Sequence, residues 1–336
     1  MATIKDVARI ARVSTASVSR VLSGQTGSSA AMRARVLAAA GELNFRPNAV
    51  ARSLRTTGTR TVGLVVPDLL NPFFTELARA VEDTARGAGF SLIVGNADED
   101  PTQQDHYVRI LLERQVDGLI VVPTVETSPL LREAADHGQP LVLVDRPAQD
   151  VHAPTVRGDG AAAIAELVDH LVLTGRHHMA IVTGPDQAGT SRERLLAFRA
   201  ALSGHGIDLP EERILHGNFR AESGYRSLAA LLASPEIPDS ILVTNGPMAQ
   251  GALRLLSEQA TSSAVRVPDD LALAVFDDMP WFTLLRPTLT AIVQPTTRLG
   301  ERAMHMLLDR INGRDVIDER IACELVLRGS TEGRIT

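Results

Sequence analysis

The spacing of apolar residues over the first 45 positions predicts three short helices. Apolar side chains recur every three or four residues over positions 4–11 and 15–22, which places them on one face of each helix. These side chains are Ile4, Val7, Ala8 and Ala11 in the first helix and Val18, Val21 and Leu22 in the second. A third helix is expected over about 30–43, with an apolar face of Met32, Val36, Leu37, Ala40 and Leu43. Three helices of this length form a core that is marginal by size.

Polar residues around the first two helices predict how each helix begins. Thr3 and Asp6 have the spacing of a capping box, and Ser14 can accept a hydrogen bond from the first turn of the second helix. Arg12 and Val13 form the turn between the helices. The outer face of the second helix is left with Thr15, Ala16, Ser17, Ser19 and Arg20. Two capped helices with this turn and this outer face suit a helix-turn-helix that enters the major groove of DNA.

From Thr61 onward, apolar strands alternate with helices. Strands are predicted at 61–67, 91–95, 118–122, 140–144, 179–183, 240–244 and 271–276, and helices at about 73–87 and 159–173. Continuous apolar strands separated by helices indicate parallel sheets with helices on both faces. The length of this region, about 275 residues, and its two similar blocks predict two doubly wound lobes rather than one.

Charge is distributed unevenly along the chain. Residues 1–60 carry ten basic and two acidic residues, whereas the rest of the chain carries 24 basic and 38 acidic residues. A basic segment on an acidic body is typical of a DNA-binding segment joined to a domain that does not bind DNA, because the neutralisation of phosphates drives affinity. The net charge of −6 for the whole chain hides this asymmetry.

Several classes of protein are disfavoured by the sequence. Charged residues interrupt every long apolar run and the N-terminus, so neither a transmembrane helix nor a signal peptide is expected. The single cysteine, Cys323, suits the cytoplasm and a small buried residue. The loop Gly184–Ser191 has no lysine for a phosphate-binding loop, and His177 and His178 have no partners at metal-ligand spacing. The acidic run Asp98–Asp100 is interpreted as a solvated loop. We therefore expect no enzyme activity, no metal and no cofactor.

The first 22 residues resemble the N-terminal helix-turn-helix of the lactose repressor (LacI) family of bacterial transcription regulators. In that family the chain opens with T-[IL]-x-D-V-A-x-x-A-x-V-S-x-x-T-V-S-R-V-[LI], and the run from Thr3 to Leu22 matches nearly every fixed position. Arg12 departs from the family, which often has Gly or Asn at this turn, and a left-handed backbone there costs about 1 kcal/mol. The segment Asn44–Arg55 similarly resembles the hinge of the family, L-x-Y-x-P-N-x-x-A-R-x-L.

The resemblance implies how the chain would bind DNA. The helix over 15–22 would lie in the major groove, and Arg20 would face a guanine. A hinge helix over about 49–55 would place Leu54 in the minor groove as a wedge. From spacing alone, a flexible linker in which Leu54 packs on a neighbour is equally consistent with this segment. The expected DNA-binding residues are Thr3, Ser14, Thr15, Ala16, Ser17, Ser19, Arg20, Asn48, Ala51, Leu54 and Arg55.

Polar and aromatic residues follow the predicted strands, at the edge of each sheet where ligands bind in open parallel sheets. Such side chains suit a polyhydroxylated or heterocyclic small molecule, and several match effector-contacting positions of the family. The candidate effector-binding residues are Asp68, Phe73, Phe74, Asp145, Arg146, Arg194, Phe219, Asn245, Asp277 and Trp281. For each of them, a structural role such as a helix cap or an interlobe salt bridge is the alternative. Gly246 departs from the family, which often has Asp there.

These features predict an N-terminal all-α helix-turn-helix domain and an α/β effector domain of two doubly wound parallel-sheet lobes. In the family this second domain resembles periplasmic sugar-binding proteins. We expect the helix-turn-helix at 1–46, a hinge helix and linker at 47–59, and the effector-binding and dimerisation domain at 60–336. The first lobe is expected over about 60–158 and 291–320, and the second over about 159–290 and 321–336.

The predicted function is a cytoplasmic DNA-binding transcription repressor whose operator affinity is controlled by a small molecule bound between the two lobes. A carbohydrate is the expected effector. The chain would act as a homodimer or a tetramer on a palindromic double-stranded DNA operator, with no membrane partner. The alternatives are a cytoplasmic small-molecule-binding protein or enzyme on the same lobes, and an architectural DNA-binding protein without an effector.

Overall fold

The computed structural model describes residues 2–22, 27–45, 58–126, 128–148, 150–259 and 265–333. The chain forms two compact units, Met1–Thr59 and Arg60–Thr336, which we call the head and the body. The predicted hinge residues Asn48, Ala51, Leu54 and Arg55 lie outside the described residues.

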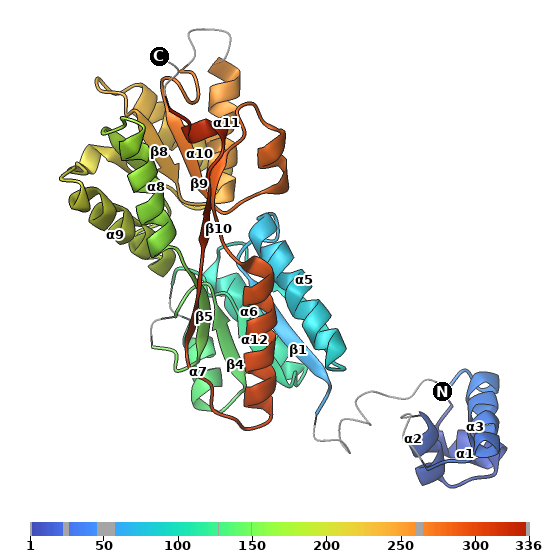
Figure 1. The fold of residues 1–336 in the computed structure, drawn as a ribbon. Helices are drawn as coiled ribbons and strands as arrows, with labels where there is room; N and C mark the ends of the chain where they lie inside the picture. The colour runs from blue at the N-terminus through green and yellow to red at the C-terminus, as the bar shows by residue number, and fades with distance from the viewer. Residues whose placement is uncertain are drawn as a thin grey trace. The chain divides into compact units, whose positions relative to one another are not determined.

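The described part of the head contains the three predicted helices, α1 (Ile4–Ala11), α2 (Thr15–Leu22) and α3 (Ala30–Glu42) (Figure 1). Val7, Val18 and Val36, one from each helix, are fully buried at its centre. The predicted apolar face of α3 is wrong at Leu37, which is 53% exposed, because the face that packs on α1 and α2 contains the smaller Ala39 and Ala40.

In the first lobe of the body, six parallel strands form one sheet in the order β11-β5-β4-β3-β1-β2. Helices α5 (Pro72–Gly87) and α12 (Thr296–Ile311) cover one face, and α6 (Pro101–Glu113) and α7 (Pro129–Asp136) cover the other (Figure 1). Because both faces are covered, the central strands are apolar on both sides, as their sequences indicate. The strands are β1 (Thr61–Val66), β2 (Ser91–Asn96), β3 (Gly118–Val121), β4 (Leu141–Val144), β5 (Thr155–Asp159) and β11 (Glu319–Ala322).

The second lobe repeats this plan with the strand order β12-β10-β9-β8-β6-β7. Helices α8 (Ala161–Leu173) and α9 (Gly189–Gly204) pack on one face, and α10 (Ala221–Leu232) and α11 (Gly246–Gln259) pack on the other. The strands are β6 (Met179–Thr183), β7 (Ile214–His216), β8 (Ser240–Val243), β9 (Ala272–Phe276), β10 (Thr290–Val293) and β12 (Glu324–Val326). Three short 3-10 helices complete the described part of this lobe, at Glu211–Arg213, Pro280–Leu284 and Gly329–Thr331.

The two predicted parallel sheets are confirmed, with one departure at an edge: β12 pairs with β10 in antiparallel orientation. The carboxyl ends of the parallel strands in both lobes point toward the boundary between the lobes. Strand β11 leaves the first lobe across that boundary, and the chain continues directly into β12, which therefore runs opposite to its neighbours (Figure 1).

The predicted lobe boundaries also need correction. The chain crosses between the lobes after β5, after β10 and between β11 and β12. Residues 291–293 therefore belong to the second lobe, and Asp159 and residues 321–322 belong to the first. The strands that decide these boundaries, β5, β10 and β11, are four or five residues long and were not predicted.

Within the described residues, no helix is long and apolar enough to cross a membrane. In the same ranges, no group of three or more His, Cys, Asp and Glu side chains could hold a metal ion. Cys323 is buried, as predicted, and burial raises the pKa of its thiol to about 12.

Candidate functional site

The turn between α1 and α2 is built from local contacts. The N–H and the hydroxyl of Thr3 donate to the Asp6 carboxylate at 2.9 and 2.7 Å, and these hydrogen bonds lower the pKa of the carboxyl. The Ser14 hydroxyl accepts from the Ser17 N–H at 3.1 Å at the start of α2. Arg12 adopts the left-handed conformation, with φ 51° and ψ 50°. The caps and the left-handed turn residue are thus present as the sequence indicates.

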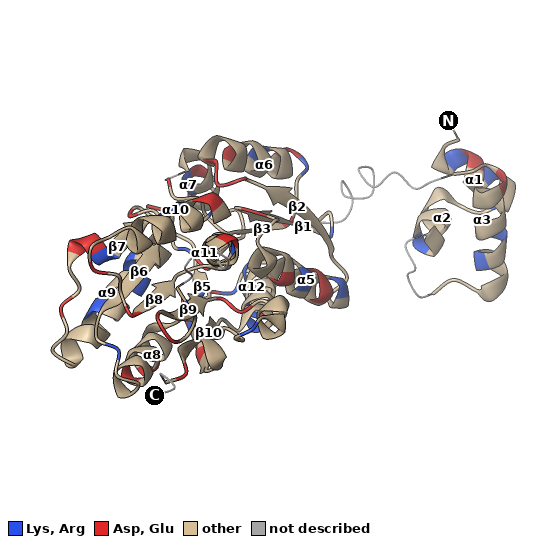
Figure 2. Cartoon of the chain, turned by 90° about the horizontal axis from the view of Figure 1, so that it is seen from above, with Lys and Arg blue, Asp and Glu red and all other residues tan. Residues whose placement is uncertain are grey.

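Helix α2 turns its predicted outer face to solvent. Thr15, Ala16 and Arg20 are exposed and Ser17 and Ser19 are half-buried, whereas Val18 and Val21 are buried on the opposite side. Figure 2 marks Lys and Arg positions in blue on the helices of the head, consistent with the excess of basic residues in this part of the sequence. An exposed face of small polar groups with one arginine is accessible to the edges of base pairs.

In the body, residues that follow the strands of the two lobes meet at the lobe boundary. Among the described residues three ion pairs bridge the lobes here: Glu193 pairs with Arg157 at 2.5 Å and with Arg320 at 3.5 Å, and Arg220 pairs with Asp98 at 3.0 Å. The two pairs of Glu193 join α9 to β5 and β11, and the pair of Arg220 joins the start of α10 to the loop after β2. These pairs connect the two lobes directly.

Arg146, which follows β4, lies at the centre of this boundary. Its guanidinium donates to both carboxylate oxygens of Glu99 at 2.9 Å, and its Cζ lies 4.7 Å from the ring centroid of Phe219 and 6.0 Å from that of Phe74. Burial lowers the pKa of Arg146, but Glu99 and Asp145 together more than offset this, so the pKa lies above its ordinary value. The interpretation of Asp98–Asp100 as a solvated loop is therefore wrong for Glu99, whose side chain is 13% exposed. The signal in the sequence was its position directly after a strand, at the ligand-binding edge of the sheet.

Asp145 and Asp277 are two buried carboxylates near the same boundary. Burial raises the pKa of both, although Arg194 lowers each of them. Both residues have a positive φ, 63° for Asp145 and 76° for Asp277. Asp277 accepts from the Gln294 side chain at 2.8 Å, and Arg194 donates to the Thr244 carbonyl at 2.6 Å while its guanidinium lies over the Phe276 ring. The structure therefore brings Asp145, Arg194 and Asp277 together, as the sequence indicated.

Other candidate residues have structural contacts instead. Asn245 caps α11 by accepting from the Met248 N–H at 2.9 Å, and its amide donates to the Phe219 carbonyl at 3.1 Å. Asp68 accepts from the Leu70 N–H in its own turn. Phe73 lies in the core of the first lobe, and Trp281 packs edge-on against Phe282.

Gly246, the departure from the family pattern, packs against the end of the Met279 side chain, which a larger residue would have to displace. A Cβ at this position would lie 2.1 Å from Cε of Met279. The backbone of Gly246 also forms a hydrogen bond with Asp277. The glycine thus lets the start of α11 approach both residues closely.

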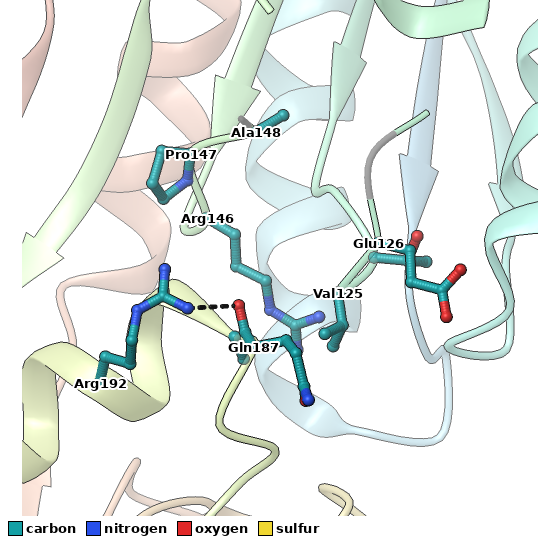
Figure 3. A pocket seen from close by; sticks show the side chains of 10 residues that line it. Val125, Glu126, Arg146, Pro147, Ala148, Gln187 and Arg192 are labelled. Atoms are coloured by element: carbon teal, nitrogen blue, oxygen red, sulfur yellow. Dashed lines mark hydrogen bonds between the residues drawn. The ribbon is translucent and has the colours of Figure 1, made fainter. Parts of the chain in front are cut away.

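A cleft of about 300 Å³ opens beside Arg146, and we call it the interlobe cleft (Figure 3). It is lined by residues 124–126 and 146–148 of the first lobe and by residues 187–189 and Arg192 of the second. Arg146 is the one predicted effector residue among them, so the sequence missed most of the lining. Thr124 and Arg192 carried no motif, and their proximity depends on how the lobes pack.

Several buried polar atoms at the lobe boundary have no hydrogen-bond partner. Among the described residues these include the hydroxyls of Thr124, Ser191 and Thr244 and Nε of Arg146. Each follows a strand or lies in the first turn of the helix after it. Buried polar groups are nearly always paired, so a cluster of unpaired ones indicates a place for a polar molecule. The arrangement can bind a hydrogen-bonding ligand, and we find no catalytic constellation among these residues.

Two protein-family models match the chain. Residues 3–48 match the model of bacterial regulatory proteins of the lacI family, and residues 168–331 match a periplasmic binding protein-like domain. The first match covers the described helices of the head, and the second covers most of the second lobe.

Whole-length relatives are transcriptional repressors. The chain is 35% identical to the HTH-type transcriptional repressor PurR of Photobacterium profundum, over 99% of each chain. It is 33% identical to the ribose operon repressor of Escherichia coli, over 98% of this chain and all of that one. A crystal structure of the lac repressor dimer bound to operator and the anti-inducer ONPF superposes with a TM-score of 0.83 at 28% identity, covering 98% of this chain and 99% of that chain.

Proposed function

The chain belongs to the lacI family of bacterial regulatory proteins. We propose that it binds a palindromic operator as a homodimer and that a carbohydrate effector changes its affinity for that operator. The chain is a DNA-binding transcriptional repressor controlled by a small-molecule effector. We further propose that the operator is palindromic, that the effector is a carbohydrate, and that the residues named below contact each of them.

The exposed face of α2 supports the proposed contacts with DNA. Arg20 can donate in bidentate fashion to a guanine, and Thr15 and Ala16 stand on the same exposed helix to meet neighbouring base edges. Ser14 and Ser19 would contact phosphates. In the proposed complex, Leu54 of each subunit enters the minor groove at the centre of the operator.

A single observation carries the proposed effector site: the unpaired buried polar atoms at the lobe boundary. A hydroxylated ligand would supply partners for these groups and would touch both lobes at once. Such a ligand changes the balance between lobe arrangements only by the difference in its affinity for them. The lobe angle is therefore the proposed link between effector and operator.

Selection of operators from a random duplex library tests the DNA-binding proposal. We expect a palindromic site, and we expect Arg20→Met to weaken binding to that site about 10- to 100-fold and to relax the preference at one base pair. Arg9→Met is the control, because Arg9 is an exposed arginine of α1. This variant should lower the affinity for all DNA sequences by the same factor. A site without symmetry, or equal behaviour of the two variants, would contradict the proposal.

A thermal-shift screen of sugars and nucleobases tests the effector proposal, followed by gel shifts with each compound that binds. We expect a sugar to raise the melting temperature of the body and to change operator affinity. Arg194→Ala and Asp277→Ala should each lower the affinity for this ligand, since both side chains lie at the lobe boundary. A ligand that keeps its full affinity for both variants would remove these residues from the site.

A further inference from the structure

The aromatic faces at the lobe boundary are covered by the chain itself. The Arg146 guanidinium lies over both Phe219 and Phe74, at 4.7 and 6.0 Å from their centroids. Glu99 holds it there through two hydrogen bonds, and the Pro123 carbonyl accepts a third at 3.3 Å. Because a cation over a ring is favourable and this one is buried and paired, a flat ligand would have to displace it in order to stack on these rings.

The lining of the interlobe cleft beside Arg146 includes one basic side chain from the second lobe, Arg192. Arg192 is anchored by the carbonyls of Asp186 and Gln187 at 3.1 and 2.8 Å. In the described ranges no carboxylate forms an ion pair with it, and the Asp186 carboxylate pairs with His216 instead. The charge of Arg146, in contrast, is neutralised by Glu99. Figure 3 shows Arg192 on one side of the cleft and Glu126 on the other.

The first turn of α9 adds to the positive potential of this side. The helix is sixteen residues long, and its N-cap is Ala188, which has no side-chain acceptor for the first N–H groups. Ala188 and Gly189 line the cleft. The start of a helix carries a partial positive charge and free donors, both of which favour a negatively charged group.

Two buried donors in the lining point independently to a ligand. Thr124 and Arg146 are each 5% exposed, and the Thr124 hydroxyl and Arg146 Nε have no hydrogen-bond partner. Asp145 is near Nε, at 3.8 Å, which is too far for a hydrogen bond. The two groups lie across the cleft from α9, so a molecule that fills the cleft can meet both sides.

We propose that the interlobe cleft takes a small hydroxylated anion, a sugar phosphate or a sugar acid, and that Arg146 keeps flat ligands off Phe74 and Phe219. The acidic group faces Arg192 and the first turn of α9. The hydroxyl groups meet Thr124, Arg146 Nε and the Glu126 carboxylate. A cleft of about 300 Å³ is large enough for a ligand of this size. The inference rests on the proposed effector function and names the ligand class.

Calorimetric titration of the full-length chain at constant ionic strength tests this. The probes are inorganic phosphate, glucose, glucose 6-phosphate, gluconate, ribose, ribose 5-phosphate and adenosine. We expect at least one anionic sugar to bind ten times more tightly than its neutral parent and than inorganic phosphate. Comparison of the phosphates with gluconate then tells which acidic group the cleft prefers.

Variants of two arginines on α9 locate the bound anion. Arg192→Gln should lower the affinity for the anionic sugar about tenfold or more, because a charge-assisted hydrogen bond is lost. Arg199→Gln is the matched control, since Arg199 lies on the same helix and pairs with Glu211 outside the cleft. Arg146→Met should allow adenosine to bind where the wild-type chain does not, and circular dichroism checks that this variant folds.

Each other outcome counts against the inference. It is overturned if neutral sugars bind as tightly as anionic ones, if no anionic sugar binds, or if Arg192→Gln behaves like Arg199→Gln. If inorganic phosphate binds as tightly as a sugar phosphate, the proposed contacts between the sugar hydroxyl groups and the cleft are wrong. A neutral sugar that alters operator affinity would end this inference and leave the proposed function intact, whereas failure to bind any operator would end the proposed function.

Discussion

The helix-turn-helix of the head and the interlobe cleft of the body are assembled from contacts at very different distances along the chain. In the head, each capping contact joins residues three positions apart, Thr3 with Asp6 and Ser14 with Ser17. In the body, Arg146 meets Glu99, which is 47 residues away, and Phe219 on the other lobe. A sequence motif can therefore predict a site built from near neighbours, such as the helix-turn-helix. A site such as the interlobe cleft forms only when loops distant in the sequence pack together.

The largest expected effect concerns the small core of the head. Val18→Asn places an amide at a fully buried position, which costs more than a marginal three-helix core can tolerate. We expect operator binding to fall about 100-fold or more in a gel shift. Leu37→Gln is the control, because Leu37 is half exposed, and should retain binding. The melting temperature of the body should not change in either variant, and a lower one would contradict the independence of the two units.

Neighbouring acidic residues offer a matched test of the body. Glu99→Gln leaves the buried Arg146 without its counter-charge and should destabilise the body by about 3 kcal/mol. Asp98→Asn breaks the pair with Arg220, which is exposed at both ends, and should cost less than about 1 kcal/mol. Urea unfolding of both variants measures the difference. Equal losses would show that Arg146 is not the centre of the boundary.

The buried carboxyl of Asp145 predicts a dependence of stability on pH. Its pKa is raised by burial, so the folded state holds the proton more tightly than the unfolded state does. The stability it contributes is complete below the ordinary pKa of an Asp and is lost as pH rises through the raised value. Asp145→Asn cannot ionise, so it should raise the melting temperature at pH 7 by roughly 2 °C and less at pH 4. An equal change at both values would contradict this origin, and Asp83→Asn on the surface of α5 is the control.

The smallest expected effect concerns the turn of the head. Arg12→Gly relieves the left-handed conformation and should stabilise the head by up to about 1 kcal/mol. Arg9→Gly, in the helical part of α1, should destabilise it by about the same amount. Thermal unfolding followed by circular dichroism on the isolated transition of the head distinguishes the two. A loss of stability in both variants would mean that a contact of the Arg12 side chain stabilises the head by more than the left-handed conformation destabilises it.

Much of the fold was predictable because regular patterns report local physics. The spacing of Val7, Val18 and Val36 and the caps at Thr3 and Ser14 indicate the head without any distant contact. Long apolar strands such as β1 and β9 were found because burial on both faces demands continuous apolar residues. The short strands β5, β10 and β11 were missed, since three or four pairings in a sheet stabilise segments that have little pattern of their own.

The candidate effector site was predictable only in part. Asp145, Arg146 and Asp277 were found because they follow strands, and the edge of a parallel sheet is where ligands bind. The same reasoning gave Asn245 and Asp68, whose polar atoms are used by local caps. Position at a strand end does not distinguish a side chain that faces the other lobe from one that closes its own turn.

The family, the architecture of the head, the exposed face of α2 and the set of charged residues near the strand ends all follow from the sequence alone. These depend on hydrogen bonds and packing between near neighbours along the chain. Three features appear only once the chain has folded: Glu99 neutralises Arg146, Arg146 covers the Phe74 and Phe219 rings, and Thr124 and Arg192 line the same cleft. Their side chains come from loops of two lobes, and the energy of each contact depends on burial that exists only after the lobes have packed.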